Sequence, residues 1–389
     1  MSKSNYVIRV HESPLALDAR AWNELLAMQA KPTPFMQHEF LAALHRSGSA
    51  TPATGWHPQF ITLHDPSGTL QAACPLYLKD HSRGEYVFDW AWADAYRRHG
   101  LPYYPKAVVA VPFTPVPGSR LLARDAAART ALVDAALARG RELGLSSLHL
   151  LFGDATDIEV CGQAGLMQRH TVQFHWQNRP PRPYADFDDF LMALNQEKRK
   201  KIRQERRKVD QAGVTLRHAR GKAIPASDWE LFYRCYERTY LEHGNLPYLA
   251  PSFFEEIARA QSEHWLLFVA ERQGHPIATS LVAVSDTGSE KVAWGRYWGA
   301  MERVDCLHFE ACYYSPLQWC IAHGYQRFEG GAQGEHKLAR ALLPVRTTSA
   351  HWLAHPDFAR AVEDFLEREG RGVEEYLDVL EQHSPLKSG

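Results

Sequence analysis

The chain contains an internal repeat. Two segments, 60–80 and 266–286, each consist of an apolar run, a charged turn with glycine and a second apolar run, the pattern of a β-hairpin. Gly68 in the first segment aligns with Gly274 in the second, 206 residues later. Because a repeat of this size fixes the architecture of a chain, it constrains the fold more than any other feature of the sequence.

The match continues in the same order along most of the chain. The aligned pairs are Trp22 with Trp229 (offset 207), Trp92 with Trp298 (206), Gly144 with Gly324 (180), and FHW at 174–176 with AHW at 350–352 (176). The offset falls mainly because the first half contains a proline-rich insertion, PYYPKAVVAVPFTPVPGSR (102–120). Ordered matches with nearly constant offsets indicate two copies of one domain.

Each copy is predicted to contain helices, a hairpin, a long strand, a loop, a helix and a further strand. In the second copy, apolar residues at 309, 313, 317 and 321 have near-helical spacing, and Gly324 ends the helix before the strand RFEGG. A strand–helix–strand crossover favours parallel pairing. The sequence therefore predicts an α/β fold with a mixed sheet in each copy.

A basic segment marks the junction between the copies. Residues 197–208, EKRKKIRQERRK, carry eight Lys/Arg and two Glu, and only a thin apolar stripe runs along the predicted helix. We place the domains at 1–190 and 191–389, with the basic helix opening the second. Residues 357–381 carry nine acids and three Arg, and this acidic stretch could attract the basic helix.

This order of elements resembles the Fem-type branch of the acyl-CoA N-acyltransferase (GNAT) superfamily. The segments that carry the resemblance are KRKKIRQERRKVDQAGVTLRHA, DWELFYRCYERTY, FVAERQGHPIATSLVAV, VAWGRYWGA, IAHGY and FEGGAQGEHK. HFEACYY with GAQGEHKLARALLPV is also similar to predicted N-acyltransferases labelled peptidoglycan biosynthesis or recognition proteins. The resemblance implies a tandem duplication of the GNAT fold, with a degenerate first copy and the active site in the second.

The resemblance leaves the acyl donor open. Fem-type enzymes use aminoacyl-tRNA, whereas ordinary GNAT enzymes hold acetyl-CoA on backbone N–H groups of a glycine-rich loop before a helix. The corresponding segment here, MERVDCLHF (301–309), has no glycine, and the long helical hairpin that some Fem enzymes insert for tRNA is also missing. We expect no permanently bound cofactor, and a donor that is aminoacyl-tRNA, acyl-CoA or another carrier.

The segment GGAQGEHK (330–337) is the strongest candidate for chemistry. Its glycines allow a ligand close to the backbone, and acyl transfer needs a base for the amine and a donor for the oxyanion. Glu335 or His336 is the predicted base, and Lys337 serves the oxyanion or a substrate carboxylate. The first copy has GDATDIEV at this place, so the asymmetry favours a site over a plain turn.

Further residues are predicted to bind the substrate. Arg296 lies in an apolar strand and needs an anionic partner, either a substrate group or an internal carboxylate of Glu329 or Glu310. The whole predicted set is Arg296, Tyr297, Trp298, His308, Glu310, Tyr313, Glu329, Gly331 and Gln333. His308, Cys312 and His336 match no common metal signature, so no metal site is predicted.

The basic helix has three interpretations. It binds RNA or another phosphate-bearing ligand, touches an anionic membrane surface, or is a solvated face. The residues assigned to phosphate or RNA are Lys198, Arg199, Lys201 and Arg203. The segment has no aromatic residue, which argues against base stacking.

The sequence predicts an N-acyl- or aminoacyltransferase that acts on an amine, such as that of a peptidoglycan precursor or a peptide. The alternative is a non-catalytic protein that binds a peptide, a cell-wall fragment or an acyl carrier in the cleft between the copies. Six cysteines without a C-x-x-C motif favour a reducing cytoplasm, and no apolar run is long enough to span a membrane. We expect a cytoplasmic protein that reaches at most the inner membrane surface.

Overall fold

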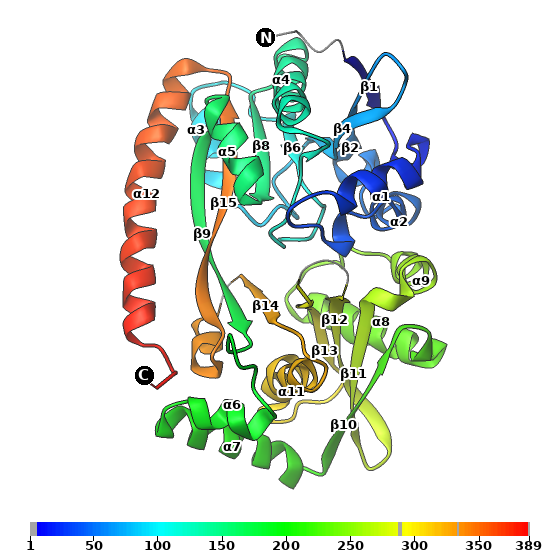
Figure 1. The fold of residues 1–389 in the computed structure, drawn as a ribbon, viewed down its shortest axis with the longest axis vertical. Coiled ribbons are helices and arrows are strands. Elements are labelled where there is room, and N and C mark those ends of the chain that lie inside the picture. The colour runs from blue at the N-terminus through cyan, green and yellow to red at the C-terminus, as the bar shows by residue number, and fades with distance from the viewer. Residues whose placement is uncertain (1–5, 287–289, 333, 388–389) are drawn as a thin grey trace. The chain divides into compact units, whose positions relative to one another are not determined.

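The computed structural model describes residues 6–286, 290–332 and 334–387 (Figure 1). The chain forms two compact units. Unit 1 comprises Met1–Thr171 and Arg346–Glu374, and unit 2 comprises Val172–Val345 and Glu375–Gly389. Three elements contribute to both units: β9 (Met167–Gln177), β15 (Leu343–Leu353) and α12 (Pro356–Gln382). None of the helices in the described ranges has the length and apolar character needed to cross a membrane.

Unit 1 contains two groups of strands with a helix-covered core. An antiparallel sheet has the order β1 (Val7–His11), β3 (Phe60–His64), β4 (Leu70–Cys74), β7 (Leu122–Ala123). The second row is β15, β8 (Ser147–Gly153), β6 (Lys106–Val109), β5 (Leu76–Lys79), β2 (Trp56–Pro58), in which only β6 and β8 run parallel. The helices are α1 (Ala19–Ala27), α2 (His38–Arg46), α3 (Trp90–Arg98), α4 (Ala126–Glu142) and α5 (Ala155–Gln163).

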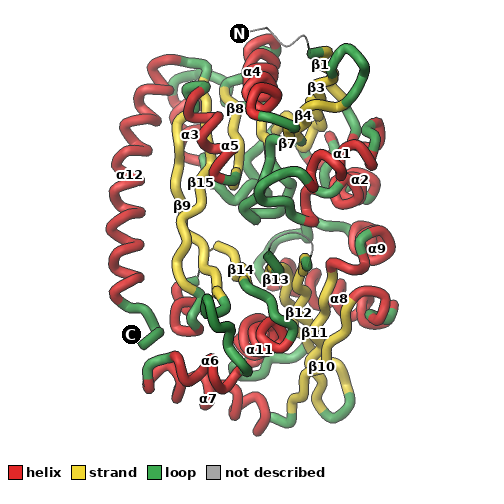
Figure 2. The backbone as a smooth tube through the Cα atoms, in the orientation of Figure 1, coloured by secondary structure: helices red, strands yellow, loops and turns green. Residues whose placement is uncertain are grey.

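Unit 2 is built around one sheet. Its strand order is β10 (Val214–Arg220), β11 (Trp265–Arg272), β12 (His275–Ser285), β13 (Val292–Ala300), β14 (Arg327–Ala332), β9. The helices are α6 (Phe187–Ala193), α7 (Gln196–Gln211), α8 (Ala226–Glu242), α9 (Pro251–Ala260) and α11 (Ser315–Ala322), drawn in red in Figure 2, and the short α10 (Leu307–Phe309). β13 and β14 are parallel and the other pairs antiparallel, which confirms the predicted mixed α/β sheet.

The repeat is also visible in the register of the strands. In unit 1, His351 of β15 lies opposite His149 of β8. In unit 2, His175 of β9 lies opposite Glu329 of β14. These positions differ by the sequence offsets of 176 and 180 residues, so the duplication is visible as equivalent cross-strand pairs. The last strand of each copy therefore belongs to the unit built mainly from the other copy, and the units differ from the contiguous ranges 1–190 and 191–389.

The first copy departs from the expected long strand at 85–101. The chain instead forms a loop and helix α3, in which Trp92 and Tyr96 are buried on one face at helical spacing. Three alanines within this segment also favour a helix. Strand β6, from the proline-rich insertion, takes the place of the missing strand. It pairs antiparallel with β5 and parallel with β8, just as β13 in unit 2 pairs antiparallel with β12 and parallel with β14.

Candidate functional site

A pocket opens in unit 2 where β13 and β14 stop pairing. The parallel register covers only Val292–Trp294 of β13 against Arg327–Glu329 of β14. Beyond it lies a cavity of about 130 Å³, lined by both strands and by the helical segment that follows Cys306. The register of β13 with β12 skips Arg296, since Leu281 faces Tyr297 and Val282 faces Gly295. A bulge of this kind redirects side chains, and here consecutive residues of β13 line the cavity.

The helical wall of the pocket contains a π-helical turn, Glu310–Tyr314, between α10 and α11. The turn adds one residue to the helical period, so Tyr313, five residues after His308, lines the same pocket as His308. The two rings contact each other edge to face, with centroids 5.6 Å apart. Cys306 begins the segment with φ +66°, a conformation that is uncommon for a residue with a side chain.

The predicted catalytic loop depends on its glycines. A Cβ on Gly330 would come within 2.3 Å of the Leu342 side chain and 3.1 Å of the Phe174 carbonyl oxygen. Gly331 and Gly334 have φ values of +77° and +92°, which favour glycine. After them a 3₁₀ helix, Glu335–Arg340, carries the polar residues. Gln333 lies outside the described residues, as does the side chain of Glu335.

His336 and Tyr313 meet at this pocket. The distance from the Tyr313 hydroxyl to His336 Nε2 is 3.1 Å. Partial burial, together with the cations of Arg340 and Lys337, lowers the pKa of His336 below its ordinary value. Burial also raises the pKa of the Tyr313 phenol. At neutral pH the imidazole is thus uncharged and the phenol protonated, so the pair offers one proton acceptor and one proton donor.

Two further titratable groups belong to this region: His308 lines the cavity, and Lys337 follows His336 in the 3₁₀ helix. Lys337 is buried, and burial lowers its pKa to about 8. Its Nζ donates a hydrogen bond to the Gly331 carbonyl at 3.2 Å, which places the ammonium beside the glycine turn. Burial and the nearby cations of Arg340 and Lys337, with His336, lower the pKa of His308 to about 4. His308 thus lines the cavity as a neutral imidazole, while His336 contacts Tyr313 and the Lys337 ammonium lies beside the glycine turn.

The other predicted substrate residues divide into pocket and framework. Arg296, Tyr297 and Trp298 line the cavity. Of the two carboxylates considered as internal partners of Arg296, Glu310 forms two 3.0 Å hydrogen bonds with Arg206, and Glu329 accepts one from Arg327 at 3.0 Å. Glu310 and Glu329 thus anchor the walls of the site, and their assignment to substrate binding stays a prediction.

Helix α7 has two distinct faces. Its outer face presents Lys201 and Arg203 to solvent, with Lys198 and Arg199 half-buried. Its inner face buries Ile202, Glu205 and Val209, and Glu205 bonds the Tyr314 hydroxyl and Arg340. Sequence reasoning missed Glu205, although its spacing of three residues from Ile202 and four from Val209 places it on the apolar stripe.

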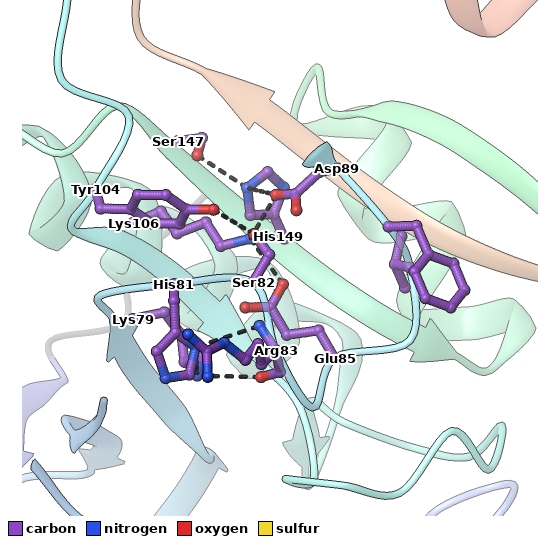
Figure 3. A network of polar contacts seen from close by, with 12 residues as sticks. Lys79, His81, Ser82, Arg83, Glu85, Asp89, Tyr104, Lys106, Ser147 and His149 are labelled. Atoms are coloured by element: carbon purple, nitrogen blue, oxygen red, sulfur yellow. Dashed lines mark hydrogen bonds and ion pairs between the residues drawn. The ribbon is translucent and has the colours of Figure 1, made fainter. Parts of the chain in front are cut away.

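Unit 1 contains a buried polar network that the sequence did not suggest (Figure 3). Lys106 is 0% exposed and donates to Glu85 Oε2 at 2.7 Å, to Ser82 at 2.9 Å and to Asp89. His149 adjoins it, within 2.8 Å of both Ser147 Oγ and His351 Nδ1. Burial and the Lys106 cation lower the pKa of His149 to about 3. Lys106 comes from the insertion, so the repeat alignment gave no signal for it.

Comparisons with known proteins support this architecture. A family model described as FemAB-like, peptidoglycan biosynthesis/recognition, matches residues 14–388. One similar solved structure is the C-terminal domain of a putative lysylphosphatidylglycerol synthetase from Agrobacterium fabrum, with 12% identity, a TM-score of 0.54, and 89% of this chain and 95% of that chain covered. FemX has 10% identity and a TM-score of 0.54, with 89% of this chain and 98% of that chain covered. L-PGS from Bacillus licheniformis has 10% identity and a TM-score of 0.52, with 93% of this chain and 99% of that chain covered. No curated protein sequence gives a significant match. At these identities the structural likeness shows the fold alone.

Proposed function

Because the chain belongs to the FemAB-like family, we propose that it is an N-acyl- or aminoacyltransferase whose reaction takes place in the pocket of unit 2. The observation that carries the proposal is the contact between the Tyr313 hydroxyl and His336 Nε2, at 3.1 Å, beside the gap between β13 and β14. One similar structure is called a lysylphosphatidylglycerol synthetase, a name that describes joining a lysyl group to a lipid. Transfer of an activated acyl group to a nucleophile fits both the name and the pocket.

The proposed step uses the two residues as a proton relay. The acceptor amine attacks the carbonyl carbon of the activated acyl group, and its proton passes to His336. As the bond to the donor breaks, Tyr313 gives its phenolic proton to the leaving oxygen or sulfur. His336 then returns the proton to Tyr313 through their hydrogen bond, which restores both groups. Lys337 supplies positive charge for the oxyanion that forms during the attack.

The donor in this proposal is an aminoacyl-tRNA or another carrier rather than acetyl-CoA. The segment 301–309 that precedes the helical wall has no glycine with which to wrap a pyrophosphate. The acceptor is the amine of a peptidoglycan precursor or a peptide. Lys198, Arg199, Lys201 and Arg203 of α7 would meet the phosphates of the donor, and no resident cofactor takes part. The reaction would occur in the cytoplasm, at or near the inner membrane surface.

The test is a transfer assay with purified protein, bulk aminoacyl-tRNA or acyl-CoA esters, and precursor peptides. His336→Ala and Tyr313→Phe should each lower the rate by roughly 100-fold or more, the range for loss of a general acid or base, without weakening substrate binding. His275→Ala, at the exposed start of β12, is the matched control and should keep full activity. Tight binding without product in the wild-type protein would instead support the non-catalytic alternative.

A further inference from the structure

The 3₁₀ helix that carries His336 has little intrinsic stability. It spans six residues, Glu335–Arg340, and its flanking residues Gly334 and Ala341 both have left-handed backbone conformations. Short helices of this type have poor hydrogen-bond geometry, so neighbouring elements must fix their position. Catalysis in the proposed pocket requires the His336 imidazole to stay within hydrogen-bonding reach of Tyr313.

One arginine connects this helix to two other elements. Arg340 is only 2% exposed, and its Nη1 donates to the His336 carbonyl oxygen at 2.6 Å. Its Nη2 donates to Glu205 Oε2 at 2.8 Å. The guanidinium also lies over the Phe309 ring, 3.5 Å from the ring centroid, at the start of the helical wall. A planar guanidinium with several fixed donors can make these contacts together, whereas a lysine ammonium cannot.

Glu205 is the counterpart on α7. It is 8% exposed, although it belongs to the strongly basic segment 197–208, and it also accepts a hydrogen bond from the Tyr314 hydroxyl. Tyr314 directly follows Tyr313 in the π-helical turn. The carboxylate therefore holds both sides of the proposed proton relay, Arg340 and His336 on one side and the π-helical turn on the other.

Resting on the proposed function, we infer that Glu205 and Arg340 are positioning residues that hold the His336 imidazole against Tyr313. The pair does not touch the reacting atoms. It fixes the backbone of His336 through the carbonyl contact and fixes the π-helical turn through Tyr314. This gives the inner face of the basic helix a role in the reaction that its charge pattern does not reveal.

The experiment measures the pKa of His336 directly by NMR titration of its imidazole, with the resonance assigned by its absence in His336→Ala. Arg340 lowers the pKa of His336, so Arg340→Met should raise it. Glu205→Gln, which keeps the size of the side chain, leaves Arg340 without its counter-charge and should lower the pKa further. Asp228→Asn removes an ion pair to Arg217 elsewhere in unit 2 and should leave the titration unchanged.

Arg340→Lys separates charge from geometry. The variant keeps the positive charge, so the pKa of His336 should stay close to that of the wild type, while kcat should fall roughly 10- to 100-fold through loss of alignment, with KM little changed. Equal titrations in Arg340→Met and Glu205→Gln, shifts in the same direction, or full kcat in Arg340→Lys would each overturn the inference. If the wild-type protein transfers no acyl group, the proposed function fails and the titrations alone decide whether the pair acts on His336.

Discussion

Each unit has a cross-strand pair at an equivalent position, but the residues of the pair and their surroundings differ. In unit 1, His149 faces His351 beside the buried cation of Lys106. In unit 2, Glu329 faces His175, and the strands beyond it separate to form the pocket of about 130 Å³. The duplication preserved the strand pairing, while unit 1 has a buried polar network beside the pair and unit 2 has an opening. Shared scaffold and separate chemistry are what a diverged duplicate is expected to show.

This contrast between the units arises because one aligned segment forms different structures in the two copies. Residues 85–101 of the first copy align with β13, the strand that carries Arg296 in the second. In the first copy they form a loop and α3, and the loop places Glu85 and Asp89 against Lys106 of the inserted strand β6. Removing that network should therefore affect unit 1 mainly through stability, whereas changes at the pocket should affect unit 2 mainly through activity.

Replacement of Lys106 is expected to have the largest effect on stability. Lys106→Met leaves the carboxylates of Glu85 and Asp89 buried without their cation, which should lower the free energy of unfolding by about 3–5 kcal/mol. Lys337→Met, the matched change in unit 2, removes a hydrogen bond to a backbone carbonyl and should cost about 1 kcal/mol. Urea denaturation of both variants checks the difference, and equal losses would contradict the contrast between the units.

The second prediction uses the aligned positions Gly299 and Ala93. A Cβ on Gly299 would lie 2.0 Å from the Cys235 carbonyl oxygen, because α8 packs tightly against β13. Gly299→Ala should therefore destabilise the protein by about 1–3 kcal/mol through overpacking. Ala93→Gly, within helix α3, should cost only about 1 kcal/mol through helix propensity. Thermal unfolding measures both, and a neutral Gly299→Ala would mean that α8 can shift away from the strand.

The sequence allowed some of these features to be predicted and not others. Repeats, glycines and helical spacing predicted the duplicated α/β fold, because they depend on local periodicity. Neither α3 nor β6 was predicted, since 85–101 was aligned with a strand of the second copy and no element was assigned to the proline-rich insertion. Of the predicted site residues, Arg296 and Tyr313 line the pocket and His336 contacts Tyr313, and their roles stay predictions. Glu205 was missed because its role depends on a contact with Arg340, 135 residues away.

A smaller effect is expected from pH. The pKa of His149 is lowered from 6.5 to about 3 and that of His351 is also lowered, so the folded state binds fewer protons than the unfolded state. Their contribution to stability is present above pH 6.5 and is lost as the pH falls. Glu85 has the opposite sign, since burial raises its pKa to about 7 and its contribution is lost as the pH rises.

Comparison with a histidine variant isolates the effect of the pair. Between pH 6.5 and 4 the wild type should lose more stability than His351→Asn, in which one of the two buried imidazoles is gone. Denaturant unfolding at a series of pH values gives the two curves. Parallel curves would show that the equivalent cross-strand pair of unit 1 does not sense pH, and would weaken the contrast with Glu329 and His175.

The smallest change in stability is expected on the outer face of α7, which belongs to the unit with the open pocket. Lys201→Gln and Arg203→Gln remove exposed charges, so each should change the free energy of unfolding by less than about 0.5 kcal/mol.

The same two variants test whether α7 binds the donor. If Lys201 and Arg203 meet donor phosphates, each variant should reduce the salt dependence of aminoacyl-tRNA binding, by about one unit of slope in log Kd against log salt. Arg20→Gln, which removes an exposed charge in unit 1, is the control, and filter binding at several salt concentrations gives the slopes. Because Glu205 and Arg206 on the inner face bond to Arg340 and Glu310, the same helix would then join donor binding to the geometry of the pocket. Slopes unchanged in both variants would restrict the role of α7 to its inner face.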